Sequence, residues 1–461
     1  MKVAGPALGM HSVFKHVALS HVRTALAAAR QPSVVRSLAT VTPTTTTSRN
    51  HRVVVIGNGS AGVAVSHQLL RKGHFNQDDI AVVDPGKWHH YQPGWTLVGG
   101  GLNDKQSFKR PMKELVETRI RLYDHHVAAI HPEDNCLSLG TGDRIHYDQL
   151  VIAPGIRVDY GSIKGLTEAM DNPDSLVASI YSYKHCDKVF RNIQRLDRGS
   201  AIFTQPSGLV KCAGAPQKIM WLALDHWRRA GLYNNDSKKS VIKTIFATGL
   251  PTMFGVPKYS AKLDELREER GVTGLFEHNL TSIDGNIATF DQAKGQQPVK
   301  QHFDFLHVAP KNVPHSFVKE SGLGNEAGFV DVDLHSLQHK VFKNIWSLGD
   351  AASLPTSKTV AAITSQAPTL TQNLLLGLEG KEPQSAYDGY TSCPLLTGDK
   401  KVLLAEFKYG GVPKETFKSW FGIDQGAPRR AFYHLKKDFF PWVYDRYHVK
   451  GQWGGPKGWI S

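Results

Sequence analysis

A glycine-rich turn between a strand and a helix constrains this chain more than any other feature. The turn is Gly57-Asn58-Gly59-Ser60-Ala61-Gly62. It follows the β-branched run His51–Ile56, which is typical of a strand buried in a parallel sheet. A helical pattern comes next, and a second short strand, Ile80–Val83, ends at Asp84. Strand, G-x-G-x-x-G turn, helix and strand in this order predict a dinucleotide-binding unit.

Each glycine of the turn has its own physical role. Gly57 permits the tight turn, Gly59 lets the backbone approach a pyrophosphate, and Gly62 lets the helix pack closely on the strand. The free N–H groups at the start of the helix favour the phosphates. Asp84 is expected to accept hydrogen bonds from a ribose. It lies 27 residues after Gly57, and a loop around residues 73–79 explains this longer spacing.

Two later segments favour FAD over NAD as the bound dinucleotide. Tyr147–Gly155 (YDQLVIAPG) and Asn344–Asp350 (NIWSLGD) resemble segments of flavoproteins that have two dinucleotide-binding domains. In those proteins the aspartate that matches Asp350 holds the ribityl chain, and Gly349 lets the backbone approach the cofactor. We expect the helix that follows Asp350 to point its N-terminus at the flavin, where its dipole stabilises negative charge.

The middle of the chain lacks a nicotinamide-binding fingerprint. The strand Ser200–Thr204 is followed by Gln205–Pro216 (QPSGLVKCAGAP), which contains no G-x-G-x-x-G. Proline removes a backbone N–H that would bind phosphate, and the turn is too long and too bulky. The sequence therefore predicts a second dinucleotide-binding fold without a nicotinamide site, and a different electron donor.

The four cysteines are too few and too scattered for a disulfide scaffold or a zinc knuckle, and no metal site is expected. Cys136 and Cys186 are interpreted as buried, inert thiols. Cys212 precedes a helix predicted to start near Pro216, and a thiol there, beside lysines 211 and 218, favours its thiolate form. Cys393 lies in a stretch predicted to be a polar loop (residues 387–398). From these residues alone, an inert thiol remains the ordinary interpretation for both.

Positive charge is concentrated at the two ends of the chain. Of the net charge of +14, residues 1–52 carry 7 Lys/Arg and no acid, and residues 400–461 carry 12 Lys/Arg and 5 Asp/Glu. Residues 53–399 are balanced, which argues against specific nucleic-acid binding. The Arg-rich, acid-free beginning predicts a mitochondrial transit peptide followed by the spacer TPTTTTS. The alternative is a disordered tail without a targeting role.

Aromatic residues are concentrated near the C-terminus. Residues 405–461 hold 14 of the 43 Phe, Trp and Tyr, including Phe439–Tyr444 (FFPWVY) between Lys436-Lys437 and Arg446. The chain has no apolar run long enough to span a bilayer. Aromatic residues interleaved with basic ones predict one or two helices lying on a membrane surface. Core packing or an oligomer contact is the alternative.

Five segments resemble the mitochondrial sulfide:quinone oxidoreductases, a family of disulfide-oxidoreductase flavoproteins. The two that contain cysteines are more specific than the nucleotide fingerprint, and in order the five cover nearly all of residues 52–456. They are YQPGWTLVGGG (Tyr91–Gly101), VKCAGAPQKIM (Val210–Met220), SLGDAASLPTSKT (Ser347–Thr359), YDGYTSCPLLTG (Tyr387–Gly398) and GQWGGP (Gly451–Pro456).

The resemblance implies an α/β fold with two Rossmann-like dinucleotide-binding domains, as in glutathione-reductase-like flavoproteins, and a C-terminal membrane-associating region. The implied division of the chain is a transit peptide and linker (1–48), the first part of an FAD-binding domain (49–165), a second Rossmann-like domain without a nicotinamide fingerprint (166–309), the second part of the FAD-binding domain (310–390), and a redox-cysteine loop with an amphipathic membrane and quinone region (391–461).

The resemblance also implies site residues. Cys212 and Cys393 become the catalytic redox pair beside the flavin. The chain departs from the family pattern in having Asp84 in place of the commoner Glu, Ala61 in place of a frequent Gly, and Pro154 in the turn after residue 152. The implied FAD-binding residues are Gly57, Gly59, Ser60, Ala61, Gly62, Asp84, Gln92, Val127, Gly349, Asp350, Lys358 and Val360.

The implied activity is that of an FAD-dependent oxidoreductase acting on a sulfur group with a quinone acceptor. Hydrosulfide attacks a disulfide, with or without a bridging sulfur, and one cysteine becomes a persulfide. Family analogy favours Cys393 for the persulfide. The other cysteine leaves as a thiolate and reduces FAD, which passes two electrons to ubiquinone at the mitochondrial inner membrane, while glutathione or sulfite takes the outer sulfur. The alternatives are a single-subunit NADH:quinone oxidoreductase and a non-enzymatic flavoprotein redox sensor.

Overall fold

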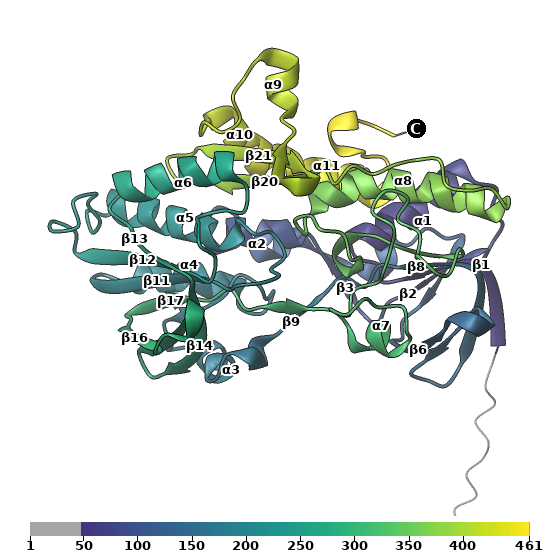
Figure 1. The fold of residues 1–461 in the computed structure, drawn as a ribbon, viewed down its shortest axis with the longest axis horizontal. Helices are drawn as coiled ribbons and strands as arrows, with labels where there is room; N and C mark the ends of the chain where they lie inside the picture. The colour runs from purple at the N-terminus through teal and green to yellow at the C-terminus, as the bar shows by residue number, and fades with distance from the viewer. Residues whose placement is uncertain (1–47, 461) are drawn as a thin grey trace, which may run out of the picture. The chain divides into compact units, whose positions relative to one another are not determined.

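Two sheets with helices packed against them, one mixed and one all parallel, organise residues 48–460, the part of the chain that the computed structural model describes (Figure 1). The predicted transit peptide lies outside these residues, apart from Ser48. The predicted α/β class with two Rossmann-like units is confirmed by the two sheets.

The first sheet has the strand order β5-β2-β1-β8-β7-β6, and β19 pairs with β8. Its central strands pair in parallel and are buried because they consist largely of Val, Ile and Leu. The predicted strand 51–56 forms the buried end of β1. The strands are β1 (Ser48–Ile56), β2 (Ile80–Val83), β5 (Ile120–Tyr123), β6 (Val127–His131), β7 (Cys136–Leu139), β8 (Arg144–Ile152) and β19 (Ile345–Ser347). Helices α1 (Ser60–Lys72) and α8 (Val360–Leu378) pack against each other beside this sheet.

The second sheet has the order β10-β17-β11-β12-β13, with every pairing parallel. Its strands are β10 (Val177–Ala178), β11 (Gly199–Gln205), β12 (Ile242–Thr248), β13 (Thr273–Phe276) and β17 (Phe305–His307). The accompanying helices are α4 (Cys186–Arg195), α5 (Ala215–Arg229) and α6 (Pro257–Glu269). An antiparallel sheet continues from it, formed by β14 (His278–Asp284), β15 (Ile287–Gln292) and β16 (Val299–His302).

The chain crosses between the two halves twice, and the two crossings lie side by side. They pair as the antiparallel strands β9 (Arg157–Val158) and β18 (Asn312–Val313). Short elements complete the connections: β3 (Trp88–His90), β4 (Lys109–Pro111), η1 (Gln92–Gly94), α2 (Trp95–Gly99), α3 (Leu166–Asp171) and α7 (Ser316–Glu320).

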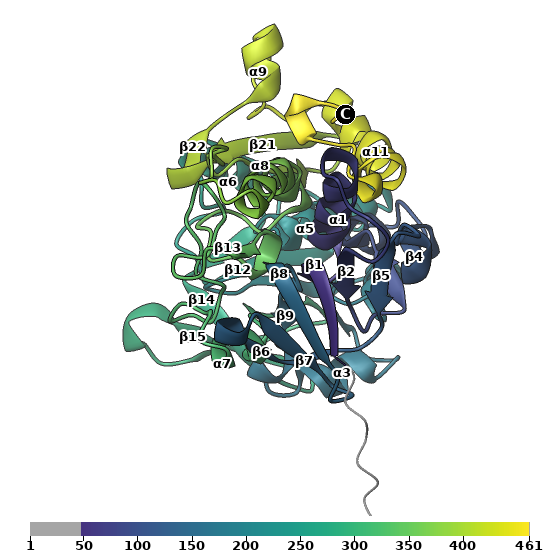
Figure 2. The same cartoon turned by 90° about the vertical axis from the view of Figure 1, so that its right-hand side faces the viewer.

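The C-terminal region lies along one side of the molecule, above α1, α5 and α8 (Figures 1 and 2). It begins with an antiparallel sheet and continues through short helices, of which α9 projects away from the body in both views. Its elements are β20 (Thr391–Leu396), β21 (Val402–Lys408), β22 (Val412–Pro413), α9 (Thr416–Phe421), α10 (Arg430–His434), the π-helix η9 (Leu435–Phe439), α11 (Phe440–Arg446), η10 (His448–Lys450) and η11 (Gly455–Lys457).

The expectation of a polar loop around Cys393 was wrong. Cys393 lies on strand β20, opposite Ala405 of β21, and is fully buried. The flanking Gly and Pro residues indicated a turn, but the apolar residues 395 and 396 continue the strand into the core. The thiol is therefore held on a regular element.

Candidate active site

The glycine-rich turn has the geometry that its sequence predicts. Gly57 has a φ of +88°, and a Cβ on it would lie 2.5 Å from the carbonyl oxygen of Ala153. A Cβ on Gly62 would lie 1.8 Å from the carbonyl oxygen of Gly57, so only glycine allows α1 to pack here. Gly59 differs, because a Cβ there would have no neighbour within 4 Å. Gly59 instead borders a cavity, as a pyrophosphate-approach position should.

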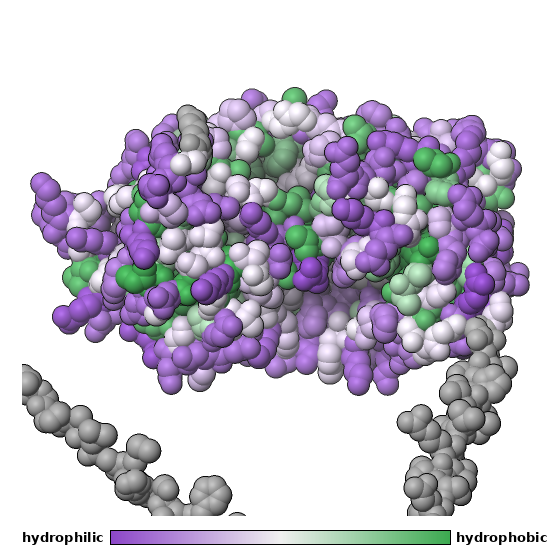
Figure 3. Space-filling view, turned by 60° about the horizontal axis from the view of Figure 1, so that its bottom comes forward, coloured by the Kyte–Doolittle hydropathy of each residue, from purple (hydrophilic) through white to green (hydrophobic). Residues whose placement is uncertain are grey.

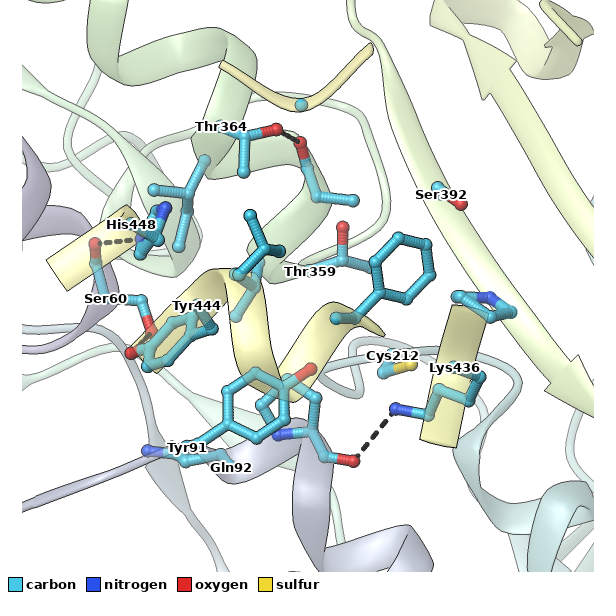
Figure 4. A pocket seen from close by; sticks show the side chains of 18 of the residues that line it. Ser60, Tyr91, Gln92, Cys212, Thr359, Thr364, Ser392, Lys436, Tyr444 and His448 are labelled. Carbon is cyan, nitrogen blue, oxygen red and sulfur yellow. Dashed lines mark hydrogen bonds between the residues drawn. The ribbon is translucent and has the colours of Figure 1, made fainter. Parts of the chain in front are cut away.

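That cavity measures about 530 Å³ and joins distant parts of the chain (Figure 4). Its walls come from the start of α1, the η1 turn, the loop before α5, the start of α8 and the C-terminal region. Cys212 lines it. The predicted FAD-binding residues that also line it are Gly59, Ser60, Ala61, Gln92, Asp350, Lys358 and Val360.

The other predicted FAD-binding residues lie outside the cavity lining. Gly57 and Gly62 shape the turn, and Gly349 (φ +69°) lets its own turn approach Ala61. The Asp84 carboxylate accepts hydrogen bonds from the backbone N–H groups of Asn58 and Gly86, both at 2.7 Å, and so holds the turn. Val127 is buried on β6.

The helix expected after Asp350 is α8, which is separated from Asp350 by a short connection. Residues 349–351 form a single 3₁₀ turn, and α8 begins nine residues later at Val360. Thr359 caps α8 by accepting a hydrogen bond from the N–H of Ala362 at 3.0 Å. Residues 359–361 line the cavity, so a helix N-terminus does face it.

The donor set of the cavity fits FAD. The turn at residues 57–62 offers backbone N–H groups to phosphates, and Asp350 offers a carboxylate to hydroxyls. Burial raises the pKa of Asp350, while the charges of Lys211 and Lys358 oppose this shift. Burial also lowers the pKa of Lys358 to about 8. The remaining lining is mostly apolar, which suits a flat tricyclic ring.

Cys393, which is buried behind the cavity wall, contacts the cavity-lining Cys212 although 180 residues separate them in the chain. The Cys393 thiol hydrogen-bonds to the Cys212 sulfur, and this bond is the largest cause that lowers the pKa of Cys212 well below its ordinary value. The positive charges of Lys218 and Lys436 lower it further, with Lys218 Nζ donating to Cys212 Sγ at 3.3 Å. The pKa of Cys393 is raised by the same hydrogen bond and by burial. The pair is therefore polarised, with the thiolate on Cys212.

The loop that carries Cys212 is strained and tightly held. Cys212 has a φ of +93°, a region that non-glycine residues rarely occupy and that is often found at functional sites. The N–H groups of Ser207 and Lys211 donate to the side chains of Asn279 and Asn312 at 2.9 and 2.8 Å. These two N–H groups are thus not free to bind a nicotinamide dinucleotide, in agreement with the missing glycine fingerprint.

Lys436 is a site residue that sequence reasoning missed. The basic pair Lys436-Lys437 was interpreted as part of a membrane surface, but the Lys436 side chain points into the cavity beside Cys212 (Figure 4). Its Nζ donates to the carbonyl oxygen of Pro93 at 3.0 Å, and burial lowers its pKa to about 7. The π-helix η9 turns it inward, and the sequence carries no signal for a π-helix. Tyr444 and His448, which also line the cavity, were missed as well.

The two remaining cysteines are inert, as predicted. Cys136 and Cys186 are both fully buried, and burial raises the pKa of Cys186 to about 12. Among residues 48–460 no group of three or more His, Cys, Asp and Glu side chains is arranged to hold a metal ion.

Comparison with known proteins agrees with this geometry. The pyridine nucleotide-disulphide oxidoreductase family matches residues 51–195. The chain is 44% identical to the mitochondrial sulfide:quinone oxidoreductase of Schizosaccharomyces pombe, over 90% of this chain and 93% of that protein.

The chain belongs to the mitochondrial sulfide:quinone oxidoreductase family.

The mouse mitochondrial sulfide:quinone oxidoreductase is 38% identical over 89% of both chains. The crystal structure of the sulfide:quinone oxidoreductase from Aquifex aeolicus superimposes with a TM-score of 0.72, at 17% identity, over 87% of this chain and 92% of that one, and supports the fold. The family resemblance, the FAD cofactor and the oxidoreductase class are thereby confirmed.

The glycines of the turn give a pair of contrasting predictions. Gly62→Ala is expected to destabilise the protein by about 3 kcal/mol or more, because the new methyl group overlaps a backbone oxygen. Gly59→Ala is expected to leave the stability of the FAD-free protein within about 0.5 kcal/mol but to weaken FAD binding at least tenfold. Denaturant unfolding and FAD titration separate the two effects. Equal losses of stability in both variants would contradict the assigned roles.

Proposed function

We propose that this chain oxidises hydrogen sulfide at the Cys212–Cys393 pair and passes two electrons through FAD to ubiquinone in the mitochondrion. The observation that carries this proposal is the polarised thiol pair, in which Cys212 lines the same cavity as the predicted FAD-binding turn and Cys393 lies buried directly behind it. The backbone N–H groups of Ser207 and Lys211 are already hydrogen-bonded within the protein and are not free to bind NADH. This disfavours the alternative of an NADH:quinone oxidoreductase.

The first step is thiol–disulfide exchange. In the oxidised pair, hydrosulfide attacks Cys393 Sγ, the bond between the two cysteine sulfurs breaks, and Cys212 leaves as a thiolate. A sulfur with a lowered pKa is the better leaving group, which supports Cys212 in this role and a persulfide on Cys393. Lys218 and Lys436 stabilise the negative charge that develops on Cys212.

The second step returns Cys393 to a thiol. A nucleophilic acceptor, which is a second hydrosulfide when no other acceptor is supplied, attacks the outer sulfur of the persulfide, the bond between the two sulfurs breaks, and the acceptor leaves with the sulfane sulfur. Re-forming the Cys212–Cys393 disulfide then releases two electrons and a proton. When bound, FAD would act as the two-electron acceptor for this oxidation and would pass the electrons to the quinone. Lys211 and Lys218 line the cavity, and their positive charge favours an anionic acceptor such as sulfite or the glutathione thiolate.

The acceptor is testable by product analysis. The purified chain in detergent is supplied with sulfide and a short-chain ubiquinone, with glutathione or sulfite as the acceptor. We expect glutathione persulfide with the first and thiosulfate with the second, each formed one-to-one with ubiquinol. Quinone reduction without a sulfur product, or with NADH in place of sulfide, would contradict the proposed function.

The C-terminal region has the surface of a membrane-associated segment. Of the five strongly exposed aromatic side chains in the described residues, four lie here: Trp420, Phe421, Trp442 and Trp459. Exposed Lys and Arg residues lie among them. The face away from this region is mostly polar, with apolar side chains in small separate groups (Figure 3). Among the helices of residues 48–460, none is both long and apolar enough to cross a bilayer. These features support association with a membrane surface, with the cavity opening toward the lipid-soluble quinone.

The projecting helix α9 gives a direct test of membrane association. Trp420 and Phe421 are 59% and 66% exposed. Replacing both with serine is expected to weaken binding to vesicles of phosphatidylcholine and cardiolipin at least tenfold, because each aromatic ring contributes about 1.5–3 kcal/mol on burial. Flotation with the vesicles measures the change. Val341→Ser, at an exposed site in the FAD-binding half, is the matched control. Equal binding by the double variant and the control would contradict the proposal.

A further inference from the structure

The C-terminal segment from Tyr444 to Pro456 packs directly on α1 and α8, the two helices whose first residues line the cavity. A Cβ on Gly451 (φ +70°) would lie 2.8 Å from the backbone nitrogen of Gln68 on α1. A Cβ on Gly455 (φ +64°) would lie 2.3 Å from Thr364 Oγ1 on α8. Only glycine permits such close approach at either position, so the segment bridges the two helices in one defined arrangement.

A hydrogen-bonded network joins this segment to the glycine-rich turn. The Tyr444 hydroxyl lies 2.7 Å from Ser60 Oγ and 2.7 Å from His89 Nε2, and His89 Nδ1 lies 3.0 Å from the carbonyl oxygen of Asn58. A carbonyl only accepts, so His89 donates through Nδ1 and accepts at Nε2 from the Tyr444 hydroxyl. Ser60 then donates to Tyr444. His448 Nε2 donates to the Ser60 carbonyl oxygen at 2.9 Å (Figure 4).

One polar atom of this network remains without a partner. His448 is 1% exposed and lines the cavity, and its Nδ1 has no hydrogen-bond partner among the described residues. Burial lowers the pKa of His448 to about 4, so the ring is neutral at physiological pH. Because Nε2 carries the ring proton, Nδ1 is a hydrogen-bond acceptor. A buried acceptor is costly when unpaired, so we expect the occupant of the cavity to present a donor to it.

The chemistry of FAD limits which of its groups can meet this atom. Its phosphates are ionised at neutral pH and offer only acceptors, whereas the hydroxyls of the ribityl chain are donors. Ser60, in the predicted phosphate-binding turn, and Asp350, the predicted ribityl contact, line the same cavity as His448. FAD also carries donors on its ribose, its adenine and the flavin N3, but the ribityl chain is the donor-bearing part that joins the pyrophosphate to the flavin, so a ribityl hydroxyl best matches an acceptor beside Ser60.

We propose that the segment Tyr444–Pro456 is a third wall of the FAD site, and that His448 Nδ1 accepts a hydrogen bond from a ribityl hydroxyl. The proposal rests on the FAD cofactor and not on the sulfur chemistry. Tyr444 fixes the orientation of this wall by joining Ser60 to His89. The exposed Trp442 and Trp459 flank this segment in the sequence, so the part of the C-terminal region between them retains the cofactor.

The test is the rate of FAD release from the full-length protein in detergent, without sulfide or quinone. Free flavin is followed by its fluorescence after dilution. His448→Leu is expected to speed release about tenfold, which corresponds to about 1.4 kcal/mol. His448→Asn supplies both a donor for Ser60 and an acceptor, and is expected to stay within about threefold of the wild type. Tyr444→Phe is expected to speed release about tenfold. Lys457→Ala, an exposed change just outside the segment, is the control and is expected to have no effect.

Several outcomes would overturn the proposal. If His448→Leu releases FAD at the wild-type rate, the His448 side chain does not help to hold FAD. If the Leu and Asn variants release FAD equally fast, His448 acts through packing and not through a hydrogen bond. Unchanged FAD release, together with a raised KM for quinone in a separate turnover assay with sulfide, would assign Nδ1 to the quinone. Circular dichroism of each variant checks its fold. The release assay contains no sulfur substrate. A negative result in it therefore does not affect the proposed sulfide oxidation, and a failure of sulfide oxidation does not affect the measured rate of FAD release.

Discussion

Replacing Cys393 with serine is expected to abolish the bleaching of flavin absorbance by sulfide, with a fall of about 10³-fold or more in rate. Serine cannot form a disulfide with Cys212, so hydrosulfide has no electrophilic sulfur to attack. Cys212→Ser is expected to have the same effect, and the double variant should be no worse than either single one, because the two thiols act as a unit. Stopped-flow absorbance under anaerobic conditions measures the rate.

The control for both cysteine variants is Cys186→Ala. This thiol is buried and has a raised pKa, so its removal is expected to leave the rate within about twofold of the wild type. FAD content and thermal unfolding should be measured for all variants, since the mutated cysteines are buried in the core. A Cys393→Ser protein that holds FAD and is still bleached by sulfide at the wild-type rate would contradict the assignment of the redox pair.

Replacing Lys218 with methionine is expected to shift the reactivity of Cys212 to higher pH. The Lys218 charge and its hydrogen bond at 3.3 Å help to lower the pKa of Cys212, so their removal raises that pKa. The thiolate then forms only at higher pH, so the pH profile for alkylation of the reduced enzyme by iodoacetamide should move to higher pH, and at any pH below the pKa the rate should fall about tenfold for each unit of pKa increase. The rate should recover as the pH is raised. Lys436→Met is expected to shift the profile in the same direction by less, because Lys436 acts on Cys212 through charge without a direct hydrogen bond.

Lys457→Met, which removes an exposed lysine from the C-terminal region, is the matched control and should leave the pH profile in place. Mass spectrometry assigns the alkylated residue. If the Lys218→Met profile coincides with that of the wild type, Lys218 does not tune Cys212. A profile displaced to lower pH would contradict the stated cause of the Cys212 shift.

The sequence predicted the parts of this site that depend on local pattern. The glycine roles follow from steric limits within one strand–turn–helix unit, and the structure shows the close contact at Gly62 and the open side at Gly59. The meeting of Cys212 with Cys393 followed from family resemblance. No local rule brings together residues that lie 181 positions apart.

The rest could not be predicted, because it depends on packing between distant segments. Lys436 appeared to be a surface residue because a π-helix has no sequence signature. Cys393 appeared to lie in a loop because Gly and Pro residues surround it in the sequence. The strand β20 forms there because its side chains are buried in the folded protein, which the local pattern does not show. Tyr444 and His448 become site residues only because they hydrogen-bond to Ser60, more than 380 residues earlier in the chain.

The central claim is that electrons enter this flavoprotein through its cysteine pair and not through a nicotinamide. The most direct test mixes the oxidised, FAD-loaded protein anaerobically with sulfide in one experiment and with NADH in another, and records flavin spectra by stopped flow. We predict complete reduction by sulfide within seconds and no reduction by NADH on that timescale. Rapid reduction by NADH, with sulfide inert, would contradict the account.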